Sequence, residues 1–338
     1  MTPGPGRRGS RGRAREGGTA VFVADLHGHA GRYRKLFDLV LAERPAAVFL
    51  GGDLLPHGLA RPGRAGTQGG DFVGDVIAPG LAALRRELGP DYPAVFAIPG
   101  NDDPRAEEPA LRATEAAGLW RYIHGVRVEW GVYAVYGYAC VPPTPFRLKD
   151  WERYDVSRFV DPGCVPPDEG WRTVEPEADP SGRVPPTIAE ELAALAGDDQ
   201  ARAIWLFHAP PYRTDLDRAA LDGRFVDHVP VDVHVGSVAV RRFIEARQPL
   251  VTLHGHVHES ARLTGRRRYE IFVDEVGRRI AEGHRLTAEV LQTIPVDQPD
   301  LFAVAPRDTL IKRPLAASNA RSTLNGHTPE PEEAGGHG

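Results

Sequence analysis

Seven side chains that could bind metal ions occur in one ordered series along the chain, each shortly after an apolar run. The runs read AVFVA, AVFLGG, VFAIPG, AIWLF and LVTLHG, and the side chains that follow them are Asp25, His27, Asp53, Asn101, His208, His256 and His258. Carboxylate and amide oxygens mixed with imidazole nitrogens suit first-row divalent ions. More than four such donors exceed the needs of one tetrahedral ion, but they are enough for two ions that share a carboxylate. The series therefore predicts a dinuclear hydrolytic site.

Strands that end at these residues would bring them to one edge of a sheet. An apolar run that stops at Asp, Asn or His is typical of a strand whose carboxyl end presents a polar group, and open α/β sheets bind ligands at that edge. The expected strands cover residues 21–24, 46–50, 94–98, 127–130, 132–138, 203–207, 250–253 and 269–273. The expected helices cover residues 30–43, 79–88, 105–117, 187–196, 237–246 and 287–292. This alternation of strands and helices indicates an α/β domain with a largely buried sheet.

The domain is expected to span residues 19–305. Residues 1–18 are rich in Gly and Arg, and residues 306–338 are mostly small, polar or acidic. Neither segment can bury enough apolar surface to offset the entropy of ordering, so we expect both to be disordered. The Pro-rich residues 141–186 are too long for a plain connection, and we interpret them as an insertion that forms a lid or stays disordered.

The composition fits a soluble enzyme. The chain has 338 residues, 41% of them hydrophobic, and a formal net charge of -5, which gives no general attraction to nucleic acid or anionic membranes. No apolar stretch approaches the roughly 20 residues of a membrane span, and the N-terminus lacks the apolar segment of a secretory signal. Cys140 and Cys164 are the only cysteines. A disulfide framework is therefore not indicated, and we expect a cytoplasmic protein. The excess of Arg over Lys is typical of a GC-rich bacterial genome.

The motifs resemble, in order and spacing, the signature of the calcineurin-like metallophosphoesterases. The segments that carry the resemblance are Asp25-Leu26-His27-Gly28, Gly52-Asp53, Gly100-Asn101, His208 and Gly255-His256-Val257-His258, within residues 20–260. The run VPPTPF…KDWER is similar to a small bacterial subgroup of single-domain phosphoesterases. The resemblance implies a four-layer αββα fold, in which a double β-sandwich is flanked by helices and the metal ions lie at the strand ends.

The same resemblance implies a role for each ligand. Asp25, His27 and His258 would bind one divalent ion, Asn101, His208 and His256 would bind the other, and Asp53 would bridge them. Mn, Fe, Zn and Ni all suit these donors. A hydroxide that bridges the two ions would attack phosphorus in line, without a covalent enzyme intermediate. The resemblance thus implies a metal-dependent phosphoric ester hydrolase.

One position departs from the family pattern. Members that cleave monoesters commonly read Gly-Asn-His-Asp/Glu, with the His near the leaving-group oxygen, whereas this chain has Asp102 there. Nearby cations lower the pKa of a carboxyl group, so Asp102 could donate a proton at pH 7 only if its pKa were strongly raised. Otherwise His29 or His124 would take this role. Asn101, Asp102 and His29 are therefore the candidate catalytic residues, and we expect diesters or activated monoesters to be favoured.

Three further residues are candidates for substrate binding. His254 flanks the last motif, and Arg147 and Lys149 could meet a substrate phosphate while Trp151 and Tyr154 stack on a base. The alternative for the segment 142–154 is a surface loop held by its aromatic residues. The expected partner is a small phosphoester, with nucleotides among the candidates. The sequence indicates no binding to a membrane and gives no strong signal of binding to nucleic acid. It does not predict the oligomeric state.

The motifs also bear on three other functions. A protein phosphatase or dinucleoside polyphosphatase would follow the bridging Asp with an aromatic residue and then Asp-Arg-Gly, whereas this chain reads Asp53-Leu-Leu-Pro-His57-Gly. A nuclease would need a Gly-Asn-His-Asp motif and a DNA-binding accessory domain. A catalytically weak or inactive scaffold that binds protein partners would typically have lost metal ligands, and all seven are present here.

Overall fold

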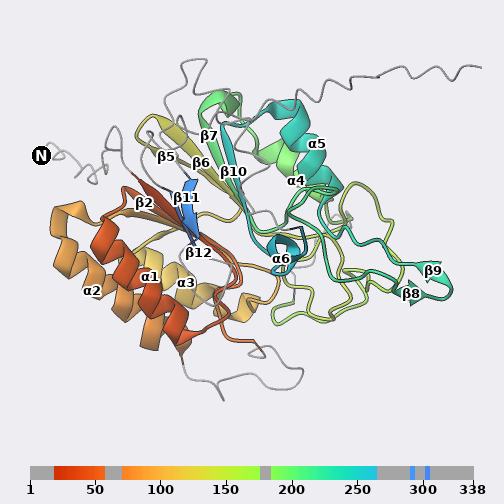
Figure 1. Cartoon of the computed structure of the whole chain (residues 1–338), viewed down its shortest axis with the longest axis horizontal. Helices are drawn as coiled ribbons and strands as arrows, with labels where there is room; N and C mark the ends of the chain where they lie inside the picture. Colours follow the sequence, from red (N-terminus) through yellow and green to blue (C-terminus); the bar gives the residue numbers. More distant parts are fainter. Residues whose placement is uncertain (1–18, 58–70, 176–183, 265–289, 294–300, 305–338) are drawn as a thin grey trace, which may run out of the picture.

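The computed structural model describes residues 19–57, 71–175, 184–264, 290–293 and 301–304. In this part of the chain, two sheets pack face to face and helices cover the outer face of each (Figure 1). The order of the layers is helix, sheet, sheet, helix, which confirms the four-layer αββα arrangement. No helix among the described residues is both long enough and apolar enough to span a membrane.

The first sheet has six strands in the order β11-β12-β1-β2-β3-β4. The parallel strands are β1 (Ala20–Val23), β2 (Ala47–Gly51), β3 (Ala94–Ile98) and β4 (Arg121–Tyr122). Strand β12 (Leu301–Val304) pairs antiparallel with β1, and β11 (Val290–Thr293) pairs antiparallel with β12. The helix expected at 287–292 is therefore wrong over residues 290–292, because these residues pair with a distant strand that local periodicity does not reveal. The strand expected at 269–273 lies outside the described residues.

Alternate side chains of the first sheet pack against different layers, as the two-residue period of a strand requires. Val21 and Val23 face the helices, whereas Phe22 and Phe49 face the second sheet. Both faces of the sheet are buried, which explains why its strands are continuous apolar runs. The helices of the first outer layer are α1 (Ala30–Glu43), α2 (Ala78–Leu88) and α3 (Glu108–Ala116), with a π-helical turn η1 (Val73–Ile77) before α2 and 3-10 turns η2 (Gly89–Asp91) and η3 (Arg105–Glu107).

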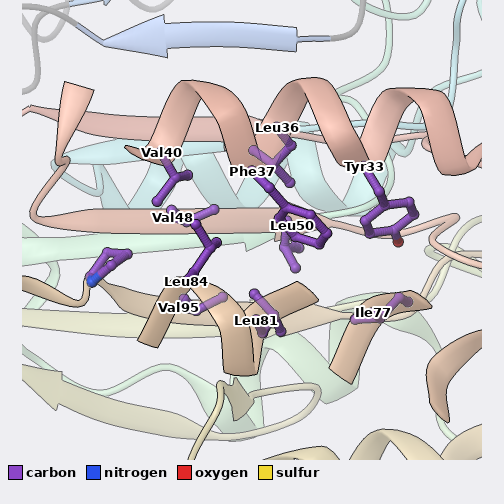
Figure 2. Close-up of a pocket in the computed structure, with 11 residues that line it drawn as sticks. Tyr33, Leu36, Phe37, Val40, Val48, Leu50, Ile77, Leu81, Leu84 and Val95 are labelled. Carbon is purple, nitrogen blue, oxygen red and sulfur yellow. The ribbon is translucent and has the colours of Figure 1, made fainter. Parts of the chain in front are cut away.

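A small apolar pocket lies between this helix layer and the sheet. Leu36 and Val40 of α1, Leu81 and Leu84 of α2, and Val48 of β2 point into it (Figure 2). Since aliphatic and aromatic carbons line it, the pocket is a gap in the packing of the core and offers no polar group to a ligand.

The second sheet has four strands in the order β10-β7-β6-β5. Its strands are β5 (Arg127–Trp130), β6 (Tyr133–Tyr138), β7 (Ala203–Phe207) and β10 (Val251–His254), and all but β5 run parallel. Helices α4 (Ile188–Leu195) and α5 (Val238–Arg247) cover its outer face through Leu192, Val240 and Phe243. The remaining elements are the turn η4 (Gln200–Arg202), the hairpin β8 (Phe225–Val226) and β9 (Val229–Pro230), and α6 (Ser260–Thr264).

The described part of the Pro-rich segment, residues 141–175, has little regular structure but packs closely on the body of the domain. The buried Trp151 donates a hydrogen bond from Nε1 to the carbonyl oxygen of Asp103 at 2.7 Å. The carboxylate of Asp150 accepts one from the backbone N–H of Arg105 at 2.8 Å. These bonds fasten the segment to the loop that follows β3.

Candidate metal centre

The loops after five strands carry the seven predicted ligands. In the first sheet, β1 leads to Asp25 and His27, β2 to Asp53, and β3 to Asn101; in the second sheet, β7 leads to His208, and β10 to His256 and His258. These strands are parallel within each sheet, so their carboxyl ends lie at the same edge. The structure brings the seven side chains together there, in two groups that share Asp53.

The first group consists of Asp25, His27, Asp53 and His258, whose donor atoms lie within 4.8 Å of one another. Nε2 of His27 is 2.9 Å from Nε2 of His258 and 3.8 Å from Oδ2 of Asp53. Nε2 of His258 is 3.4 Å from Oδ1 of Asp25. Donors about 2.1 Å from a shared ion lie roughly 3.0–3.4 Å apart, so this group fits one divalent cation.

The second group consists of Asp53, His208 and His256, with Asn101 beside them. Nε2 of His208 is 3.0 Å from Oδ1 of Asn101 and 3.4 Å from Oδ1 of Asp53. Asp53 thus directs Oδ1 to this group and Oδ2 to the first. One carboxylate between two sets of donors is the arrangement that a bridging ligand needs.

The centre is buried where it meets the sheets and is exposed to solvent on the opposite side. Asp25 and His208 are fully buried, whereas the side chains of His258, Asp102 and His57 are 41%, 31% and 59% exposed. A substrate would therefore approach from the side of these three residues.

Four of the predicted ligands have a left-handed backbone. The φ angles of Asp25, His27, Asp53 and His256 are 59°, 47°, 52° and 77°. Such angles are uncommon for residues other than glycine and cost on the order of 1–3 kcal/mol each, so they persist only where the surrounding structure fixes them. One of the fixing contacts is the hydrogen bond from the backbone N–H of His256 to Oδ1 of Asp25, at 2.8 Å. Strain of this kind gathers at functional sites.

Glycines give the loops room to approach the carboxylate. A Cβ added at Gly100 would lie 2.2 Å from Oδ1 of Asp53, and one added at Gly52 would lie 2.5 Å from Nδ1 of His208. Real Cβ atoms essentially never come so close, so larger residues at these positions would displace the ligands.

The charges inside the centre favour a cation. Burial alone would lower the pKa of His208, but the neighbouring Asp53 outweighs it and raises this pKa to about 9. Burial would raise the pKa of Asp53, yet His208 outweighs that effect and lowers it to about 2. Nδ1 of His208 lies 2.8 Å from the carbonyl oxygen of Gly51 and can donate to it, which leaves Nε2 facing Asp53 and Asn101. A metal ion at this place would substitute for the proton on Nε2.

Two other imidazoles of the centre are neutral. Burial lowers the pKa of His256 to about 3, with repulsion from His208 as the second cause. Burial also lowers the pKa of His27 to about 4, although Asp53 partly offsets it. Because neutral imidazole is the form that binds metals, these residues are already in the state that a ligand needs.

Asp102 lies beside the centre. Its backbone N–H donates to Oδ1 of Asp53 at 2.9 Å, and its carboxylate oxygen Oδ2 lies 2.8 Å from Nδ1 of His57. Burial and then repulsion from Asp53 raise the pKa of Asp102, while His57 opposes both effects.

The two histidines considered as proton donors are not among the clustered donor atoms. His29 is exposed at the N-cap of α1 and belongs to none of the groups of donor atoms. His124 packs against Trp151, accepts a hydrogen bond on Nδ1 from the backbone N–H of Ala139 and has a pKa lowered to about 3, chiefly by burial. A neutral imidazole with so low a pKa is not a proton donor at pH 7, so His124 does not fit that role.

The residues expected to bind substrate lie mostly in the packed interior. Lys149 is fully buried and pairs with Glu152 at 2.5 Å. His254 is buried, stacks on Phe207 at 5.4 Å, and its Nδ1 lies 2.9 Å from the carbonyl oxygen of Ala209. Ion pairing with Glu152 and the alternation of β10 thus direct Lys149 and His254 toward the interior, where neither side chain is exposed to solvent. Arg147 remains exposed.

The aromatic residues of this segment hold the loop. Trp151 is buried against His124, and the hydroxyl of Tyr154 donates to Oδ1 of Asp168 at 2.7 Å. These contacts favour the alternative of a loop held by its own aromatic residues over the stacking of a base.

Sequence reasoning missed three residues that support the centre. The buried carboxylate of Asp103 accepts hydrogen bonds from the backbone N–H groups of Leu54, Leu55 and Gly100, at 3.0, 2.8 and 2.8 Å. Arg32 donates to the carbonyl oxygen of Asp25 at 2.5 Å. His57 stacks on His27, with ring centroids 3.9 Å apart. The adjacency of Asp103 to the Gly-Asn-Asp motif was the one signal in the sequence that could have identified it.

Comparison with known protein families agrees with this geometry. A family model described as calcineurin-like phosphoesterase matches residues 18–260. The chain belongs to the calcineurin-like phosphoesterases. Membership of this family, together with the clustered Asp and His ligands, supports a metal-dependent phosphoesterase.

The solved structures similar to this family member are distant from it. Crystal structures that match include TT1561 of Thermus thermophilus, at 18% sequence identity and a TM-score of 0.39, over 70% of this chain and 81% of that one. Another crystal structure matches at 18% identity and a TM-score of 0.40, over 71% of this chain and 84% of that one. A comparison with curated proteins gave no match.

Proposed function

We propose that this phosphoesterase holds two divalent ions and hydrolyses diesters or activated monoesters of phosphate. The observation that carries the proposal is the position of Asp53. Its oxygens face two separate sets of donors, one around His27 and His258 and the other around His208 and Asn101. Two ions held by these residues would lower the pKa of bound water and neutralise charge on the phosphoryl oxygens.

The residues of the chain hold and orient the reacting groups. Asn101 directs Oδ1 at His208 and has two amide N–H donors, which suit a phosphoryl oxygen of the substrate. Asp25 bonds to the backbone N–H of His256 at 2.8 Å and so joins the loops after β1 and β10. The buried side of the centre, formed by Asp25 and His208, excludes bulk water.

The substrate preference follows from the residue at position 102. Histidine is suited to protonate a leaving group because its pKa lies near neutrality, and this chain has a carboxyl group there instead. Leaving groups that depart without a proton, such as nitrophenolates, should therefore react faster than alkoxides. The exposed His29 and the carboxyl of Asp102 are the candidates for any proton transfer that does occur.

The first test combines metal analysis with a substrate screen. Purified protein is analysed for Mn, Fe, Zn and Ni, and then assayed with Mn²⁺ on bis(p-nitrophenyl) phosphate, p-nitrophenyl phosphate, cyclic nucleotides and an alkyl phosphate. We expect about two ions per chain and the slowest turnover on the alkyl phosphate. A protein that binds no ion and cleaves none of these esters would instead support the scaffold alternative.

The second test is the variant Asp53→Asn. Loss of the bridging charge should remove bound metal and lower kcat/KM by at least about 100-fold, a size typical of losing a group that stabilises the transition state. Asp75→Asn, which changes an exposed carboxylate on η1, is the matched control. Wild-type metal content and turnover in Asp53→Asn would contradict the bridging role.

A further inference from the structure

His27 has a buried nitrogen that faces away from the ion site. Its Nε2 lies near His258 and Asp53, whereas its Nδ1 is buried and has no hydrogen-bond partner among the described residues. The side chain is 3% exposed, so water does not readily satisfy Nδ1. The polar atom that Nδ1 faces is Oδ2 of Asp102, at 3.8 Å.

An imidazole that binds an ion through one nitrogen carries a proton on the other, and that proton is usually donated to a carboxylate or carbonyl oxygen. Such a bond fixes the tautomer and the orientation of the ring. A shift of roughly 1 Å would bring Asp102 within hydrogen-bond distance of His27.

Asp102 is held in place from two other directions. His57 lies 2.8 Å from its Oδ2 through Nδ1, and the ring of His57 stacks on that of His27 at an interplanar angle of 18°. The backbone N–H of Asp102 donates to Asp53 at 2.9 Å. These contacts gather His27, Asp102 and His57 into one cluster.

We propose that Asp102 and His57 are positioning residues for the metal ligand His27: Asp102 accepts the proton on Nδ1, and His57 orients Asp102. This inference rests on the proposed function, since it requires an ion at Nε2 of His27. It gives the carboxyl group at position 102 a role in metal affinity.

A third ion is the competing interpretation of the same atoms. Donor atoms of His27, His57 and Asp102 lie within 4.8 Å of one another. An ion there would require His27 to bind metals through both nitrogens and to lose both of its ring protons. Neutral imidazole has only one nitrogen available as an acceptor, which favours the hydrogen-bonded arrangement.

The test is a titration of the full chain with Zn²⁺, followed by calorimetry, for wild type, Asp102→Ala, Asp102→Asn, His57→Ala and His57→Gln. We expect Asp102→Ala to bind roughly 10–100-fold more weakly, as for other partners of ligating histidines. Asp102→Asn keeps an acceptor and should bind Zn²⁺ more tightly than Asp102→Ala. His57→Gln keeps a donor and should bind Zn²⁺ more tightly than His57→Ala. Asp75→Ala is the control for removing a carboxylate, and it should bind as wild type does.

A second readout separates positioning from general damage to the fold. In the Zn²⁺-loaded wild type, NMR should show a slowly exchanging Nδ1–H proton from His27, and this signal should disappear in Asp102→Ala.

Absence of Zn²⁺ binding in wild type would overturn the proposed function itself. Two bound ions with unchanged affinity in Asp102→Ala would overturn only the positioning role. Three ions in wild type and two in Asp102→Ala would overturn it in favour of a third site. If Asp102→Ala does not fold, the affinities of Asp102→Asn and His57→Gln decide between these outcomes.

Discussion

Neighbouring residues fix the position of the Asp53 carboxylate. Oδ1 accepts a hydrogen bond from the backbone of Asp102, and Nε2 of His208 lies 3.4 Å away. Since the pKa of Asp53 is lowered to about 2, the group is charged at any physiological pH. Its position is therefore sensitive to small changes in the loop after β3.

Gly100→Ala should disturb this position without removing a ligand. The new Cβ would lie 2.2 Å from Oδ1 of Asp53, so the carboxylate or the loop must move. We expect metal affinity and kcat/KM to fall by at least about 10-fold. A displacement of about 1 Å at a reacting centre can lower the rate by roughly 100-fold. Metal titration and steady-state kinetics measure the effect.

Gly31→Ala is the matched control for this prediction. Gly31 lies in α1, and its added Cβ would meet only the end of the Arg34 side chain, at 3.9 Å. Equal metal affinity in the two alanine variants would show that the loop adapts to the new methyl group.

At the scale of elements, Asp103 ties the loops after β2 and β3 together. It accepts hydrogen bonds from Leu54 and Leu55 in the first loop and from Gly100 in the second. Burial, with repulsion from Asp53 as the second cause, raises its pKa to about 7. The three backbone bonds oppose this shift and keep the carboxyl group in place.

Asp103→Ala should lower the free energy of unfolding by at least about 3 kcal/mol, because each buried N–H left without an acceptor costs about 1–3 kcal/mol. Urea unfolding monitored by circular dichroism measures this change. Asp71→Ala is the comparison, since Asp71 is exposed and its carboxylate accepts the backbone N–H of Gly74 at 2.8 Å. A loss no larger than in Asp71→Ala would contradict the role of Asp103 as a tie between the loops.

The segment 141–175 depends on the buried pair of Lys149 and Glu152. Lys149→Met should destabilise the protein by about 3–5 kcal/mol at pH 8, since it leaves a buried carboxylate without its partner. Burial, partly offset by Lys149, raises the pKa of Glu152 from 4.5 to about 7. A raised carboxyl pKa gives stability that is present below pH 4.5 and is lost as the pH rises through about 7.

The cost of Lys149→Met should therefore be smaller at pH 5 than at pH 8, as measured by urea unfolding at both values. The double variant Lys149→Met/Glu152→Gln removes the stranded charge and should recover part of the stability at pH 8. A cost that does not change with pH would argue against an ionised Glu152 in the variant.

At the scale of the whole molecule, the candidate centre joins the two sheets. Asp25, Asp53 and Asn101 follow strands of the first sheet, whereas His208 and His256 follow strands of the second. Ions held between them would bind the folded state alone, because the unfolded chain does not bring these residues together.

Mn²⁺ should therefore raise the melting temperature of the protein. At a free concentration about 100 times Kd, the added stability is about 2.7 kcal/mol, which corresponds to roughly 4–5 °C for a domain of this size. A chelator should reverse the shift, as followed by differential scanning fluorimetry. Asp53→Asn should show no such rise; a rise equal to that of wild type would mean that Mn²⁺ binds elsewhere.

The sequence by itself determined which residues could form the centre and that strands and helices would alternate around it. All seven candidate ligands follow apolar runs, and the strand-forming pattern of such runs is local and can be read from neighbouring residues. The tertiary structure decided the rest: that Asp103 joins two loops, that His57 meets Asp102 and His27, and that Lys149 and His254 face the core. It also placed β12 beside β1 and β11 beside β12. These features depend on contacts between residues far apart in the chain, and local periodicity carries no information about which distant segments will pack together.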